Sequence, residues 1–122
     1  MSTLKSYQDL EVWKKSIELA EMVYRVSAQF PPEEKFGLTS QIRRAAASVP
    51  ANIAEGAERN ATGEFLQFLG IASGSLAETE TFLILAGKLG MISGELAGPL
   101  QAQAVDVGRM LNGLKRSLRS KP

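Results

Sequence analysis

The residues best suited to directional chemistry form one stripe on a segment expected to be helical, residues 37–59. At about 100° per residue, one side of that helix carries the polar side chains Gln41, Arg44, Ser48, Asn52, Glu55 and Arg59. Their guanidinium, amide, hydroxyl and carboxylate groups make directional hydrogen bonds, unlike the Lys and Glu of an ordinary solvated face. Two interpretations stay open: a helix–helix interface whose polar groups satisfy one another, and a recognition surface for a partner.

A carboxylate from another segment could complete this stripe. Glu78 falls at the edge of the apolar arc of residues 63–87, and a partly buried carboxylate needs a partner. By its chemical character Arg44 is the candidate partner of Glu78, and Glu55 is the other acid with which Arg44 could pair. The competing interpretation is that Glu78 is solvated and unpaired. If the pair is buried, Arg44→Ala strands a carboxylate at a cost of about 3–5 kcal/mol.

A second set of candidate residues lies near the end of the chain. No acid follows Asp106, and the basic residues beyond it are Arg109, Lys115, Arg116, Arg119 and Lys121. Cations on a helix end either complement the helix dipole or contact an anionic partner. The second interpretation predicts weak, salt-sensitive binding of RNA or DNA at Arg109, Lys115, Arg116 and Arg119. The next candidates for this role are Lys14, Lys15 and Arg43.

The composition excludes several classes of catalytic site. The 122-residue chain has no His and no Cys, so Ser-His-Asp and Cys-His arrangements and zinc sites of Cys and His are ruled out. The Glu-x-x-His ligands of di-iron bundles and a Walker-type phosphate loop are also missing. A carboxylate-only site is the one enzymatic alternative, and no motif favours it. We therefore expect no enzymatic activity, no metal and no cofactor.

Charge and hydropathy bear on location and partners. The chain carries 14 basic and 13 acidic residues, a formal net charge of +1, which does not favour tight nucleic-acid binding. No run of about 18 apolar residues predicts a membrane span, and the N-terminus lacks the pattern of a secretory signal. Together with the missing Cys, these features predict a cytoplasmic protein without membrane contact.

Hydrophobic periodicity predicts the helices that must position these residues. Four amphipathic helices are expected at about 9–30, 33–58, 63–87 and 94–119. Because short loops join them, we predict a single all-α domain over residues 1–122, an antiparallel up-down-up-down four-helix bundle. Pro50 is expected to kink the second helix without ending it, since the polar stripe keeps its phase across the proline. Helix caps are expected at Asp9, Thr62 and Ser93.

Two of these helices have more apolar surface than one buried face requires. The first carries the stripe Leu10, Trp13, Ile17, Ala20 and Tyr24 beside the stripe Val12, Leu19, Val23, Val26 and Phe30. It is either wedged between two helices or faces another subunit, and Trp13 is expected to anchor the core.

The third helix has a 3.5-residue seam of Phe65, Leu69, Ala72, Leu76, Thr79, Leu83 and Ala86. Its Gly70 and Gly74 are expected to pack closely against Ala47, Ala51 and Ala54.

The central segment also resembles a known family. QIRRAAASVPANIAEGAER, residues 41–59, is similar to the signature of the four-helix-bundle proteins encoded in intervening sequences of bacterial 23S ribosomal RNA. Supporting stretches are DLEVWKKSIELAEMVY (9–24), ASGSLAETETFLILA (72–86) and MLNGLKRSL (110–118). That family is related to the accessory variability determinant proteins of diversity-generating retroelements. The resemblance covers nearly the whole chain, in order.

The resemblance implies an oligomeric accessory protein rather than an enzyme. Related accessory proteins form a ring of five bundles with a basic surface and bind a reverse transcriptase and nucleic acid. For this chain it implies a homo-oligomer, a pentamer, that binds RNA, DNA or a nucleic-acid enzyme such as a reverse transcriptase. The nearly balanced charge departs from that pattern. The alternative function is a structural or protein-interaction oligomer that binds no nucleic acid.

Overall fold

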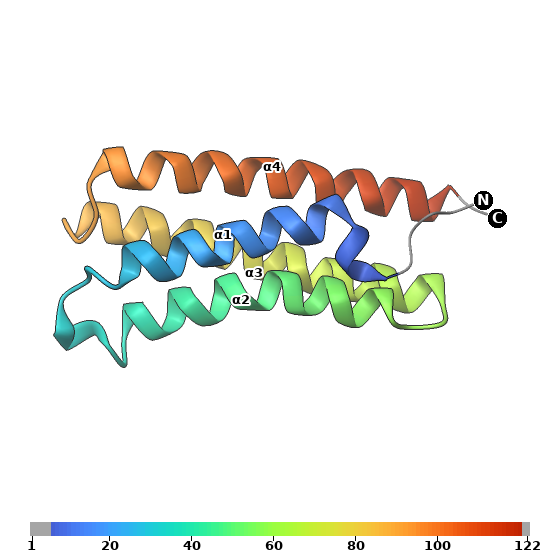
Figure 1. Ribbon diagram of the computed structural model, residues 1–122, viewed down its shortest axis with the longest axis horizontal. Helices are drawn as coiled ribbons and strands as arrows, with labels where there is room; N and C mark the ends of the chain where they lie inside the picture. The colour runs from blue at the N-terminus through green and yellow to red at the C-terminus, as the bar shows by residue number, and fades with distance from the viewer. Residues whose placement is uncertain (1–5, 121–122) are drawn as a thin grey trace.

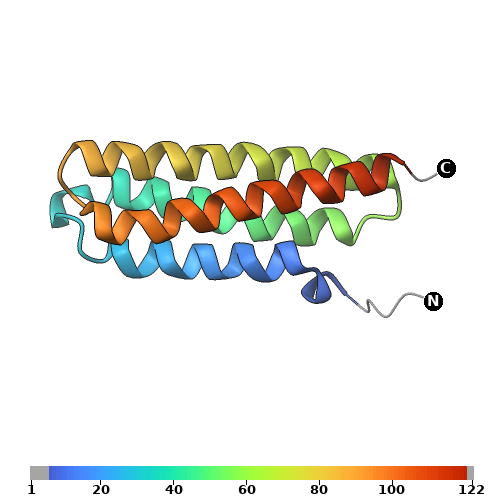
Figure 2. The ribbon, with the colours of Figure 1, turned by 90° about the horizontal axis from the view of Figure 1, so that it is seen from above.

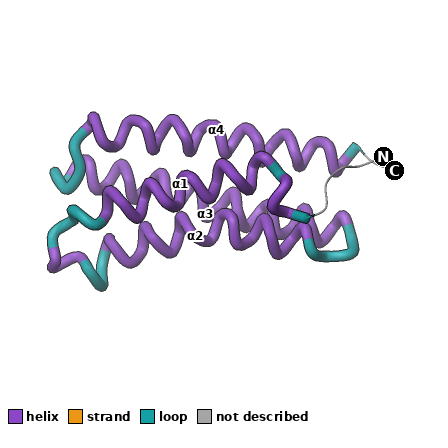
Figure 3. The backbone as a smooth tube through the Cα atoms, viewed as in Figure 1, coloured by secondary structure: helices purple, strands orange, loops and turns teal. Residues whose placement is uncertain are grey.

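Four long helices make up the computed structural model, which describes residues 6–120 (Figures 1 and 3). Their bounds are α1 Glu11–Ser27, α2 Leu38–Ala57, α3 Thr62–Lys88 and α4 Gly94–Arg119. A 3-10 turn, Tyr7–Asp9, precedes α1, and a second, Pro32–Glu34, lies between α1 and α2. No strand occurs among these residues.

Consecutive helices run antiparallel and lie side by side, so the bundle is of the up-down-up-down type. Helix α1 packs against α2 and α4, and α3 packs against α2 and α4, which places α1 and α3 on one diagonal (Figure 2). The predicted all-α four-helix bundle is therefore confirmed. Both ends of the described chain lie at one end of the bundle (Figure 1).

The core is built from one stripe of each helix. Leu19, Ile42, Ile53, Leu69, Leu83 and Leu111 are among the fully buried side chains. On α3 the predicted 3.5-residue seam lies inward: six of its members, from Leu69 to Ala86, are buried, and Phe65 packs against them. The periodicity of this helix was sufficient to identify its buried face.

The helix ends differ from the sequence expectations in several places. Helix α1 begins at Glu11 with Leu10 as N-cap, because Asp9 belongs to the preceding 3-10 turn. Helix α2 begins at residue 38 rather than 33, since the diproline leads into a separate 3-10 turn. The N-cap of α3 is Ala61, not the expected Thr62. At α4 the expected cap forms: Ser93 Oγ accepts a hydrogen bond from Leu96 N at 3.2 Å.

Helix α2 continues without interruption from Leu38 through Pro50 to Ala57. Pro50 is itself buried. The kink expected there stays a prediction.

The two apolar stripes of α1 have different environments. Val12, Leu19 and Val23 are buried in the core, whereas Ile17 is 40% exposed and Tyr24 46%. Trp13 is only partly buried and packs on the edge of the core, 5.4 Å edge-to-face from the Tyr7 ring. Trp13 therefore packs against the core from its edge, and its expected role as an anchor between helices stays a prediction.

The outward stripe of α1 and the small residues of α2 form an apolar depression, which we call the α1–α2 groove. It has a volume of about 340 Å³ and is lined by Tyr7, Trp13, Ile17, Ala20, Ala47, Pro50, Ala51 and Ala54. The expected packing of Gly70 and Gly74 against this small face was wrong. Both glycines are exposed on α3, and a Cβ added at either would meet no atom within 4 Å.

Helix α3 is unusually apolar for a helix with so much of its surface exposed to solvent. It is the one helix in residues 6–120 whose length and composition would allow it to cross a membrane, with a mean hydropathy of 1.3 over its most apolar window. Only 33% of that window is buried within the bundle. Its exposed residues include the uncharged stretch Gly70, Ile71, Gly74 and Ala77, with the exposed charges of this helix at Glu64, Glu78 and Lys88.

Candidate nucleic-acid interface

Part of the polar stripe of α2 joins this helix to α3. Asn52 Nδ2 donates to the backbone oxygen and the hydroxyl of Ser48, both at 2.8 Å. Ser75 Oγ on α3 donates to Ser48 Oγ at 2.9 Å. Since Ser75 is buried and Ser48 and Asn52 are half-buried, these bonds satisfy polar groups between two packed helices. In this section of the stripe the polar side chains serve a helix–helix interface, the first of the two interpretations left open by the sequence.

The end of the stripe carries an exposed ion pair. Arg59 Nη2 lies 2.8 Å from Glu55 Oε2, one helical turn away, and Arg59 Nη1 lies 4.0 Å from Glu64 Oε1. The Arg59 guanidinium also stacks over the Phe68 ring at 5.0 Å. With side-chain exposures of 43% and 52%, the Arg59–Glu55 pair stabilises the fold little.

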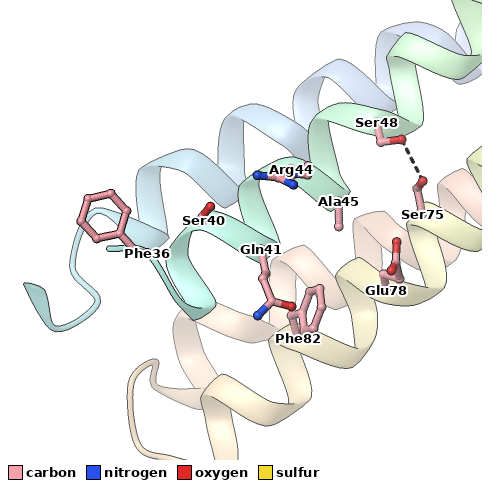
Figure 4. A pocket seen from close by; sticks show the side chains of 9 residues that line it. All are labelled: Phe36, Ser40, Gln41, Arg44, Ala45, Ser48, Ser75, Glu78 and Phe82. Atoms are coloured by element: carbon pink, nitrogen blue, oxygen red, sulfur yellow. Dashed lines mark hydrogen bonds between the residues drawn. The ribbon is translucent and has the colours of Figure 1, made fainter. Parts of the chain in front are cut away.

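Arg44 and Glu78 are not paired. Both line an open cavity of about 500 Å³ between α2 and α3, the α2–α3 cavity, together with Gln41 and Ser48 (Figure 4). Within residues 6–120, no ion pair joins Arg44 to Glu78 or to Glu55, whose partner is Arg59. The expected buried pair was wrong for a physical reason: both side chains are exposed, and a hydrated charge needs no partner.

The stability prediction for Arg44 changes accordingly. We expect Arg44→Ala to alter the free energy of unfolding by less than about 0.5 kcal/mol, as for other exposed residues without buried partners. Ile42→Ala, at a fully buried position two residues away, provides the contrast and should lose about 2–5 kcal/mol. Urea denaturation of both variants measures the difference. A loss near that of Ile42→Ala would show that Arg44 has a buried role.

The basic residues of α4 do not form one free patch. Arg109 pairs with Asp106, and Lys115 Nζ donates to Ser73 Oγ on α3 at 2.6 Å. Arg116 and Arg119 are exposed and have no carboxylate partner within residues 6–120. Lys121 lies outside the described residues. Because the Ser73 hydroxyl is neutral, Lys115 keeps its charge, and the positive charge without a carboxylate partner in this part of residues 6–120 rests on Lys115, Arg116 and Arg119.

Of the next candidates, two are paired and one is not. Lys14 lies 3.6 Å from Glu11, and Lys15 lies 3.8 Å from Glu18. Arg43 has no carboxylate partner in the described part of the chain; its Nε donates to Ser27 Oγ at 2.8 Å.

Arg43 belongs to a group that the sequence did not reveal, which we call the basic–aromatic cluster: Tyr24, Lys35, Phe36, Arg43 and Arg44. These residues line a surface hollow of about 530 Å³ at the end of the bundle opposite the chain termini. The cluster escaped notice because three separate segments contribute to it. The only local signal was an aromatic residue next to a lysine, at positions 35 and 36, outside any apolar stripe.

The comparisons with known proteins agree on one family. The family described as 23S rRNA-intervening sequence protein matches residues 8–113. A crystal structure of a protein of unknown function from the S23 ribosomal protein family of Bacteroides thetaiotaomicron is similar to this chain, with a TM-score of 0.80 and 26% sequence identity. The match covers 86% of this chain and 95% of that one. No curated protein matches. With most of its length covered, the chain belongs to the 23S rRNA-intervening sequence protein family.

Proposed function

We propose that this protein is a non-enzymatic, self-assembling accessory module that acts in the bacterial cytoplasm and binds nucleic acid, a nucleic-acid enzyme such as a reverse transcriptase, or both. The observation that carries the proposal is the set of basic side chains left without carboxylate partners, which includes Arg116 and Arg119 on α4. In a chain with a net charge of only +1, most surface cations would be expected to pair with acids. Unpaired cations keep their capacity to neutralise phosphates.

Two apolar surfaces support self-assembly. The α1–α2 groove is lined almost entirely by apolar and small residues, and α3 exposes the uncharged stretch Gly70, Ile71, Gly74 and Ala77. They lie on different helices, so one copy could place its α3 face in the groove of the next. A contact between two different surfaces is heterologous, and it closes into a ring when the rotation allows. We propose a homopentamer, the assembly that the related accessory variability determinant proteins form.

A ring multiplies weak electrostatic contacts. Each subunit repeats the unpaired cations, and several weak sites on one rigid particle act together through their effective concentration. Binding of this kind is directed at phosphates and indifferent to sequence. The logarithm of the affinity should fall with the logarithm of the salt concentration, with a slope of roughly 0.7–0.9 per neutralised phosphate.

Charge removal tests the proposal. We expect Arg116→Gln with Arg119→Gln to weaken binding of labelled RNA and DNA and to reduce the salt slope, because both cations are unpaired. Lys14→Gln with Lys15→Gln is the matched control: it removes the same charge from residues already paired with acids. Fluorescence anisotropy at low and physiological salt gives both quantities.

Two outcomes would count against this function. If the wild-type protein binds no oligonucleotide at about 50 mM salt, where phosphate contacts are strong, direct nucleic-acid binding is excluded and the structural or protein-interaction oligomer is favoured. If the two variants weaken binding equally, net charge rather than this end of α4 governs the interaction.

A further inference from the structure

We propose that the basic–aromatic cluster is a binding site for single-stranded nucleic acid, in which Phe36 stacks on an unpaired base and the neighbouring cations hold the flanking phosphates. The inference rests on the proposed function, but it assigns a different surface from α4 and a specific mode of binding. The cluster lies where the end of α1, the segment before α2 and the first turns of α2 meet.

The cations of the cluster are free to meet an anion. Lys35, Arg43 and Arg44 have no ion pair within residues 6–120, in contrast to Arg25 nearby, which lies 2.6 Å from Glu21. The carboxylate adjacent in sequence, Glu34, is engaged: its Oε1 accepts the backbone N–H of Leu38 at 3.0 Å. Three positive side chains therefore line one hollow, and no acid is among its lining residues.

Arg43 is held in place before any ligand arrives. Its Nε donates to Ser27 Oγ at 2.8 Å and its Nη2 donates to the backbone oxygen of Tyr24 at 3.1 Å. Its guanidinium also lies 4.8 Å from the centre of the Tyr24 ring. Because these contacts do not use Nη1, that nitrogen keeps its donors for a phosphate, and little side-chain entropy is lost on binding.

Phe36 is unusual among the apolar residues. It is 89% exposed, far more than any other large apolar side chain in the described chain. The Lys35 ammonium lies over one face of the ring, 5.4 Å from its centre, so a cation that can bind a phosphate stands next to an exposed aromatic ring. Exposed aromatic rings next to cations are the platforms on which unpaired bases stack.

The surface around Phe36 has room for more than one nucleotide unit. The hollow of about 530 Å³ adjoins the α2–α3 cavity of about 500 Å³, and the two share Phe36, Ser40 and Arg44. Figure 4 shows Gln41 in the second cavity, where its amide can donate to and accept from a base edge. Glu78, also in that cavity, disfavours a phosphate there, so the phosphates belong on the Lys35 and Arg43 side.

One substitution, Phe36→Ala, tests the contribution of base stacking to affinity separately from the contribution of charge. Phe36→Ala removes the ring without changing the charge, and at an exposed position it should leave the melting temperature unchanged. Base–aromatic stacking accounts for a roughly 5-fold to 100-fold gain in affinity, so we expect a loss in that range for single-stranded RNA and DNA. Duplex DNA of the same sequence, whose bases are already stacked, should bind the variant and the wild type equally. Comparing the RNA and DNA strands shows which of the two is preferred.

Two control variants distinguish a loss of stacking from a loss of charge. Val105→Ala truncates an apolar residue of α4 that is 52% exposed and should change nothing, while Arg44→Gln should weaken single strands and duplex alike. Equal affinities of wild type and Phe36→Ala for single strands would overturn this inference, and a changed particle mass in light scattering would instead assign Phe36 to a subunit contact. If wild-type protein binds no oligonucleotide, the nucleic-acid part of the proposed function fails as well. If Arg116→Gln with Arg119→Gln abolishes binding and Phe36→Ala has no effect, only this inference fails.

Discussion

Replacing Ala51 by Arg is expected to convert the assembled protein into a monomer of 13.2 kDa. Ala51 is exposed in the α1–α2 groove, so its side chain touches solvent in the isolated bundle and the neighbouring subunit in the proposed ring. An arginine there costs the isolated bundle little. In a subunit contact it would bury a charge without a partner, which is strongly unfavourable.

Light scattering over a range of dilutions measures this effect. Ala102→Arg, at an exposed position of α4, adds the same side chain outside the groove and should leave the mass of the particle unchanged. Persistence of the oligomer in Ala51→Arg would exclude the groove as a contact. A mass of a single chain for the wild type at all concentrations would exclude the ring itself.

Gly56→Ala is expected to destabilise the fold, whereas Gly74→Ala is expected to stabilise it. At Gly56, on α2, an added Cβ would lie 2.7 Å from Phe68 Cβ and 2.9 Å from Phe65 Cδ1 on α3. The Phe65 backbone oxygen, at 3.3 Å, cannot move without shifting the helix. Overpacking of this kind costs about 1–3 kcal/mol, and the helix propensity that Ala gains, about 1 kcal/mol at most, offsets part of that cost. At Gly74 nothing lies within 4 Å, so Ala should gain about 1 kcal/mol of helix propensity.

Both substitutions are best compared in the Ala51→Arg background, where assembly does not contribute to stability. Urea denaturation followed by circular dichroism gives the two free energies of unfolding. The opposite signs are the test, because the same chemical change is made in two helices of one bundle. A Gly56→Ala variant as stable as its parent would mean that α2 and α3 can separate without loss.

The sequence predicted the bundle and the buried face of α3 because both depend on local periodicity. It did not predict which stripe of α1 enters the core, since the stripes that begin at Leu10 and at Val12 are similarly apolar and only the packing of α2 and α4 selects between them. The hydrogen-bond partners of polar side chains were harder still to predict from the sequence. The Ser48–Ser75 hydrogen bond joins residues 27 positions apart, and no spacing rule anticipates such a pair.

The basic–aromatic cluster illustrates the same limit at the surface. Tyr24 and Arg43 come from different helices, and Lys35 and Phe36 from the segment between them. The diproline and the separate 3-10 turn decide where that segment folds. The basic α4 residues, by contrast, were visible as a run, yet Asp106 and Ser73 engage two of them.

The apolar character of α3 has a consequence for biosynthesis. When residues up to Lys88 have emerged from the ribosome, α3 lies outside the exit tunnel but α4, one of its two neighbours in the bundle, is still inside it. At that stage the chain presents a 27-residue helix with the length and hydropathy of a membrane segment. A chain that stalls or is truncated there would therefore expose this apolar helix and be prone to aggregation. When the 26 residues of α4 pack on the bundle, they complete the core and end the period in which α3 lacks one of its two neighbours.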